Sequence, residues 1–167
     1  RQGGGEDHAA IMNDYNGWIR TVRNCRFLGN GGALADEGVV IWRPSATADS
    51  VVIEGNLFSE LGGTAIMVQE LEHFGATPTV KVLRNRIENV CIGDDLDKEA
   101  LRARQFSAAS DVLIAYNLIN GTAPGTHPHA GIGVQEATGL RIVNNLVRAA
   151  DSGIELKRDT TDIFLRN

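Results

Sequence analysis

Charged and amide side chains recur in five short apolar phrases of this sequence, and their chemical types suit the binding of a sugar. The phrases are VVIWR (39–43), AIMVQ (65–69), ALRAR (100–104), GIGVQ (131–135) and GIELK (153–157). An arginine can hold a carboxylate, such as that of a uronic acid, through two parallel hydrogen bonds. We therefore predict a substrate-binding set that consists of Arg43, Gln69, Arg102, Arg104 and Gln135. The alternative is that these side chains only protect an exposed sheet face.

Residues with the chemistry for cleavage lie in the same phrases and in the loops between them. Hydrolysis of a glycosidic bond uses two carboxyl groups, one as acid and one as base, and CIGDDLDKE supplies adjacent aspartates. A lyase instead needs a cation beside the uronate carboxylate and a base that removes a carbon-bound proton. Histidine, lysine and arginine side chains of the later phrases suit those roles. The predicted catalytic set is Asp94, Asp95, His129, Glu155 and Lys157.

No metal site or cofactor is predicted, although calcium could bind. Glu155 or the acidic cluster at 94–97 could supply the oxygen ligands that calcium takes. The same acids also suit the first turn of a short helix in DDLDKEALRA. We predict a strand at 100–104 instead, because Arg104 precedes Asn117 by 13 positions, as Arg43 precedes Asn56.

An asparagine that interrupts strand-like phrases repeats along the chain. The phrases are VVIEGNLF (51–58), VKVLRNRI (80–87), VLIAYNLI (112–119) and LRIVNNLV (140–147). The repeated position holds Asn56, Asn85, Asn117 and Asn145, and it extends backward to Cys25 and forward to Asn167, with spacings of 31, 29, 32, 28 and 22. Asparagine is rare in strands and frequent in turns. The column therefore marks a corner that recurs in a repeat protein.

Strand units of this length cannot bury a face alone, so they must stack. Stacked parallel strands lie about 4.8 Å apart, which lets equivalent asparagine amides bond each other along the stack. We predict an all-β, single-stranded right-handed parallel β-helix of about six coils with an Asn ladder, one domain over 1–167 that is an excerpt of a longer solenoid. Cys25 and Cys91 should both be free and buried, because two coil spacings of roughly 10 Å exceed the reach of a disulfide.

Alternation along a strand sorts the five phrases into inward and outward positions. The inward set is Val40, Trp42, Ile66, Val68, Leu101, Ala103, Ile132, Val134, Ile154 and Leu156. The outward set is Ile41, Arg43, Met67, Gln69, Arg102, Arg104, Gly133, Gln135, Glu155 and Lys157.

The I-x-x-N-x-[IF] corners, the NCRF variant at Cys25 and the G-I-x-[VL] strands resemble the right-handed parallel β-helix of the pectate-lyase-like superfamily. The resemblance covers about residues 9 to 167. It implies a substrate groove along the sheet built from strands such as GIELK, and an extracellular or periplasmic location. IGDD followed by HAGIGV also resembles the paired motifs of polygalacturonase-type hydrolases, which implies a catalytic role for Asp94 and Asp95. His129-Ala130-Gly131 departs from that pattern, and no R-I-K follows.

The composition of the chain argues against some classes of binding partner. Sixteen Lys+Arg against 21 Asp+Glu give a net charge of −5, which argues against general nucleic-acid binding. No apolar run is long enough to span a membrane. We therefore expect a secreted protein that binds, and by lyase or hydrolase chemistry cleaves, a polysaccharide, with an acidic glycan favoured. The alternative is a non-catalytic structural or adhesive β-helix segment, because this architecture hosts unrelated functions.

Overall fold

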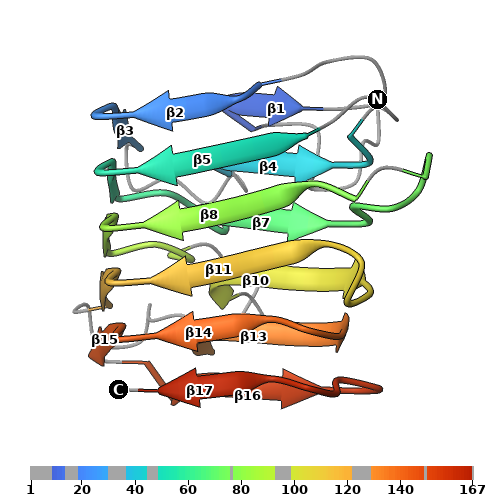
Figure 1. Cartoon of the computed structure of the whole chain (residues 1–167). Coiled ribbons are helices and arrows are strands. Elements are labelled where there is room, and N and C mark those ends of the chain that lie inside the picture. Colours follow the sequence, from blue (N-terminus) through green and yellow to red (C-terminus); the bar gives the residue numbers. More distant parts are fainter. Residues whose placement is uncertain are drawn as a thin grey trace, which may run out of the picture.

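The computed structural model describes residues 9–13, 19–29, 37–44, 49–75, 77–92, 99–121, 129–148 and 150–166. These residues form three parallel β-sheets that wind into a solenoid, with no helix among them. Figure 1 shows the strands as layers, from β1 and β2 to β16 and β17. The predicted class, an all-β parallel β-helix, is confirmed.

Each coil contributes one strand to each sheet, and each strand pairs with the equivalent strand of the next coil. Sheet A contains β1 (Ile11–Asn13), β4 (Val39–Trp42), β7 (Ile66–Gln69), β10 (Glu99–Phe106), β13 (Ala130–Ala137) and β16 (Ser152–Lys157). Sheet B contains β2 (Thr21–Arg23), β5 (Ser50–Glu54), β8 (Thr79–Leu83), β11 (Asp111–Ala115), β14 (Arg141–Val143) and β17 (Phe164–Arg166). Sheet C contains β3 (Arg26–Leu28), β6 (Leu57–Ser59), β9 (Arg86–Glu88), β12 (Leu118–Asn120) and β15 (Leu146–Arg148).

The solenoid makes about four turns, so the prediction of six coils was too high. The prediction counted corner positions, whereas a turn is complete only when the chain returns to the same sheet. Sheets A and B have six strands each, but among the described residues the full set of three strands per coil repeats only over the five strands of sheet C, which are separated by four such returns. The strand predicted at 100–104, in place of a helix, is confirmed as part of β10.

The Asn ladder forms the corner between sheets B and C. Asn85 Oδ1 accepts hydrogen bonds from the backbone N and the Nδ2 of Asn56, both at 3.0 Å. Asn117 Oδ1 accepts the same pair from Asn85, and Asn145 Oδ1 accepts it from Asn117. Cys25 takes the first place, where its backbone N donates to Asn56 Oδ1 at 2.9 Å. The buried amides are satisfied because the corner repeats.

A left-handed residue directly precedes each ladder position and turns the chain into it. These residues are Asn24 (φ 54°), Gly55 (φ 66°), Arg84 (φ 53°), Tyr116 (φ 59°) and Asn144 (φ 52°). Non-glycine residues adopt this conformation at a cost, which the surrounding stack must offset. The corner is therefore a two-residue device, with a left-handed residue for the bend and an asparagine for the hydrogen bonds.

Both cysteines are free, as predicted, but only one is buried. Cys91 is buried and its thiol lies 3.5 Å from the carbonyl oxygen of Gly63. Cys25 is exposed. The prediction was wrong for Cys25 because β3, which follows it, has a paired strand on one side only among the described residues.

For β4, the predicted assignment of outward and inward positions was wrong by one residue. Val40 pairs with Met67, and Ile41 pairs with Val68 in the core. Trp42, predicted to point inward, pairs with Gln69 and lies outside the core cluster. The sequence VVIW is apolar throughout, so alternation could not distinguish its two faces.

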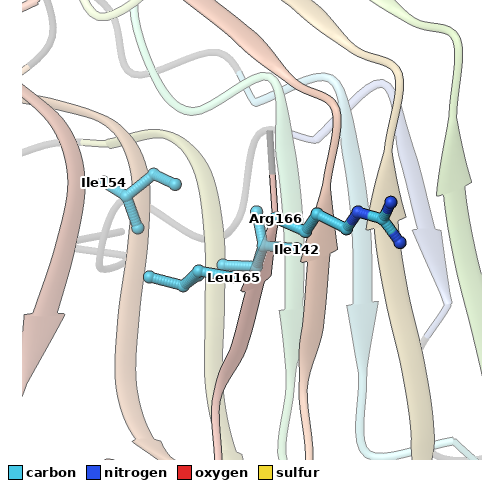
Figure 2. Close-up of a pocket in the computed structure, with 4 residues that line it drawn as sticks. All are labelled: Ile142, Ile154, Leu165 and Arg166. Atoms are coloured by element: carbon cyan, nitrogen blue, oxygen red, sulfur yellow. The ribbon is translucent and has the colours of Figure 1, made fainter.

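An apolar cavity of about 240 Å³ opens at the β16–β17 end of the solenoid. Ile142, Ile154, Leu165 and Arg166 line it, and Figure 2 shows the guanidinium of Arg166 directed away from the three apolar side chains. Ile142 belongs to the hydrophobic core and Ile154 packs against it. The cavity is thus part of the solenoid interior and is separate from the polar outer face of sheet A.

Candidate functional site

The polar side chains predicted to face outward come together on three neighbouring strands of sheet A. Arg102 of β10 lies beside Gly133 of β13, which lies beside Glu155 of β16. One step along the strands, the register aligns Arg104, Gln135 and Lys157. The core side chains between these positions, such as Leu101, Ala103, Ile132 and Val134, are fully buried. For β10 and β13, the predicted alternation is confirmed. In β16 the register agrees, but Leu156, predicted to point inward, is 48% exposed, since among the described residues no strand pairs with β16 on its other side.

A buried carboxylate that sequence reasoning missed connects two of these strands. Glu99 is the first residue of β10, and its side chain is only 8% exposed. Its Oε2 accepts a hydrogen bond from Arg102 Nε at 2.6 Å, and its Oε1 accepts one from Lys157 Nζ at 3.1 Å. A glutamate directly before an apolar strand phrase was the available signal, but nothing in the sequence showed how far its side chain would reach.

Lys157 is shared between two carboxylates. Besides Glu99, its Nζ lies 3.0 Å from Glu155 Oε2. Burial alone would lower the pKa of Lys157, but the hydrogen bonds and negative charges of Glu155 and Glu99 outweigh burial and raise it. Lys157 is therefore a stable ammonium group that donates hydrogen bonds, and it is a poor general base.

Glu155 continues the chain of contacts to His129, which directly precedes β13. The buried Oε2 of Glu155 makes no hydrogen bond of good geometry, but it lies 3.3 Å from His129 Nε2 and 3.0 Å from the Lys157 ammonium. Burial would raise the pKa of Glu155, yet Lys157 first and then His129 lower it below the ordinary 4.5. On its other side, His129 Nδ1 lies 3.9 Å from Asp151.

Arg104 is held by a residue that was predicted to contact the ligand. Gln69 is 1% exposed, and its Oε1 accepts a hydrogen bond from Arg104 Nε at 2.6 Å. Gln135 of the next strand donates to Glu136 at 2.9 Å. The prediction that Gln69 is exposed and contacts the ligand is therefore wrong in its exposure. Its buried side chain instead orients Arg104 through this hydrogen bond.

Arg43 lies outside the group, because the register places Trp42 in the column instead. Arg43 has a left-handed backbone (φ 46°), and its Nε donates to Glu70 Oε2 at 2.5 Å. Its guanidinium stacks 4.6 Å from the ring centre of Trp42, whose Nε1 donates to Glu70 Oε1. Burial raises the pKa of Glu70, but these two donors, together with the charges of Arg43 and His73, outweigh it and lower the pKa. Arg43 thus locks the end of β4 to the next coil.

Asp94 and Asp95 lie outside the described residues, so their predicted role stays a prediction. Within the ranges that the structure describes, no three His, Cys, Asp or Glu side chains gather as metal ligands. Glu155, one of the predicted calcium ligands, faces an ammonium group, which is a poor neighbour for a cation. Over the same ranges there is no helix long and apolar enough to cross a membrane.

The site is thus a chain of contacts on one face of sheet A. Opposite charges alternate along it from Arg102 through Glu99 and Lys157 to Glu155, and His129 follows as the neighbour of Glu155. It offers fixed hydrogen-bond donors and acceptors side by side. Glu155 is a carboxylate and Lys157 an ammonium, so neither has the pKa of a proton donor or acceptor near neutrality.

Comparison of the chain with protein-family models, with curated proteins and with solved structures found no match.

Proposed function

We propose that this protein binds a polysaccharide, preferentially an acidic one, on the outer face of sheet A across β10, β13 and β16. The observation that carries the proposal is the half-buried charge chain from Arg102 to His129. A sugar hydroxyl both donates and accepts hydrogen bonds, so it is recognised by donors and acceptors in fixed neighbouring positions. Side chains that already hold one another lose little further entropy when the ligand binds.

The preference for an acidic glycan rests on the cations of this face. Arg104 is oriented by the neutral amide of Gln69, and Lys157 lies two strands away in the same column. An arginine can hold a uronate carboxylate bidentately, while lysine adds a point charge. Strands lie about 4.8 Å apart, so an extended chain laid across them meets a new polar rung at each strand.

Cleavage of the bound chain is a second proposed activity, supported by the close approach of Glu155 and His129. Their side chains approach to 3.3 Å, and an ionised carboxylate beside an imidazole is a common acid–base arrangement. Because Lys157 is held as an ammonium, we assign it to neutralising the uronate rather than to removing a proton. The pectate-lyase-like relationship and secretion, both suggested by the corner motifs, belong to this same proposal.

Binding is tested by titrating oligouronates and neutral oligosaccharides of matched length into wild type, Arg104→Ala and Lys157→Ala at two salt concentrations. Each variant should bind oligouronates about tenfold more weakly, the loss of one charged contact. Added salt should weaken wild-type binding, because the Debye length is only about 10 Å at 0.1 M. Arg141→Ala removes an exposed arginine of sheet B and should leave the affinity unchanged.

Cleavage is tested on the same oligouronates by the ultraviolet absorbance of unsaturated products for a lyase, and by new reducing ends for a hydrolase. Glu155→Gln should remove turnover and keep binding. Binding without either product would establish a binding module. Oligouronate affinity that is absent in wild type would refute the proposal and favour a purely structural solenoid segment.

A further inference from the structure

Glu99 reaches across an entire strand. It begins β10 and its backbone pairs with Ala130 of β13, yet its carboxylate bonds Lys157 of β16, on the far side of β13. The carboxylate also bonds Arg102 on its own strand. Its side chain must therefore lie flat over β13 instead of projecting from the sheet.

Gly133 provides the space for this path. A Cβ atom at Gly133 would lie 2.2 Å from Glu99 Cγ, 2.7 Å from Cδ and 2.9 Å from Oε1. Gly133 is absent from the residues with positive φ, so its backbone conformation does not require glycine. The absence of a side chain at Gly133 leaves space on the outer face of β13. The carboxylate of Glu99 occupies that space, between Arg102 and Glu155.

Glu99 is too deeply buried to be a main ligand contact, at 8% side-chain exposure, so it acts through its two cations. A buried carboxylate is tolerated only when it is paired and hydrogen-bonded, and here both oxygens are occupied. In return, the carboxylate fixes the guanidinium of Arg102 and the ammonium of Lys157 relative to each other. Without it, both long side chains would regain rotamer freedom.

We infer that Glu99 is the positioning residue of this face, and that Gly133 is the specificity-determining gap that lets one carboxylate hold Arg102 and Lys157 at a fixed separation for a uronate-bearing chain. The significance for binding rests on the proposed function. The hold of Glu99 on Lys157 is independent of any ligand and is tested separately.

The first measurement is the pKa of Lys157 in the ligand-free protein. It is determined by carbon NMR of isotope-labelled lysine in wild type, Glu99→Gln and Gly133→Ala. Both variants should lower it, because Lys157 then keeps only Glu155 as a close carboxylate. The matched control is Gly153→Ala in β16, since a Cβ there meets nothing within 4 Å. An unchanged Lys157 pKa in Glu99→Gln would overturn the inference.

The second measurement distinguishes positioning from a merely structural role. In Glu99→Ala the space beside the two cations should admit formate, which should raise the pKa of Lys157 again and restore oligouronate affinity from a loss of about tenfold. Formate without effect in a folded Glu99→Ala would count against the inference. If the Lys157 pKa falls as expected but wild type binds no oligouronate, the proposed function fails while the role of Glu99 stands.

Discussion

Replacement of Asn117 by alanine tests the ladder that holds the coils together. The Asn117 amide accepts hydrogen bonds from the backbone N and the Nδ2 of Asn85, at 2.9 and 3.0 Å. It also donates to the Val82 carbonyl at 3.0 Å and to Asn145 Oδ1 at 2.9 Å. Alanine removes all four bonds and leaves two donors of Asn85 without an acceptor in a buried corner.

The expected loss follows from those two donors. A buried donor without a partner costs about 1–3 kcal/mol, whereas the net contribution of a satisfied pair is smaller. Partial relaxation of the corner reduces the sum, so we expect the free energy of unfolding to fall by about 2–4 kcal/mol. That is a large fraction of the roughly 5–15 kcal/mol that stabilises a typical domain.

The assay is urea unfolding followed by circular dichroism, in which midpoints and slopes are compared because stacked repeats can depart from two-state behaviour. Asn120→Ala is the matched control. Asn120 lies in β12 of the same coil, is half-buried, and has no side-chain hydrogen bond to the described residues, so its replacement should cost less than about 0.5 kcal/mol. Equal midpoints for Asn117→Ala and Asn120→Ala would refute the role given to the ladder.

The remaining predictions concern the outer face of sheet A. Gln69→Ala should lower the free energy of unfolding by about 1–2 kcal/mol, because Arg104 Nε loses its buried acceptor; a change within error in urea unfolding would contradict this. The stability difference between wild type and Glu155→Gln should be present above pH 4.5 and disappear as the pH falls further, because the pKa of Glu155 is lowered in the folded state. For Lys157→Gln, the difference should persist up to pH 10.5 and disappear above it, because the folded-state pKa is raised; urea midpoints across pH check both signs.

The fold could be predicted from the sequence because its signal is repeated. Each Asn corner is weak evidence alone, but the equivalent spacing of Asn56, Asn85, Asn117 and Asn145 points to one stacked architecture. The structure adds the left-handed residues before each asparagine, which vary from glycine to tyrosine. These positions share no residue type, so the left-handed residue of each corner could not be predicted from the sequence.

The first outward position could not be predicted because VVIW offers no polar residue to mark a face. Val40 is on the outward side and yet 1% exposed, so burial does not follow alternation there. A one-residue shift exchanges the two faces of a strand. As a result, Arg43 was placed in a column that Trp42 occupies.

The residues of the candidate site could be predicted from their types and positions, but the contacts that connect them could not. Arg102, Glu155 and Lys157 were expected on one face within neighbouring coils, and the register of β10, β13 and β16 places them there. The part that links them, Glu99 lying over Gly133, depends on the direction of one side chain over a neighbouring strand. Sequence alternation assigns a residue to a face, but it contains no information on where a long side chain ends.

Charge order along the columns of sheet A shows what this link adds to the face. Equivalent positions in a solenoid lie about 4.8 Å apart, so like charges in adjacent coils repel each other. In one column the neutral Gln135 separates Arg104 from Lys157. In the other, Gly133 leaves a gap that the carboxylate of Glu99 fills, beside Arg102 and against the ammonium of Lys157. The glycine therefore allows the carboxylate of Glu99 to pair with Arg102 on its own strand and, across the uncharged rung of β13, with Lys157 of β16.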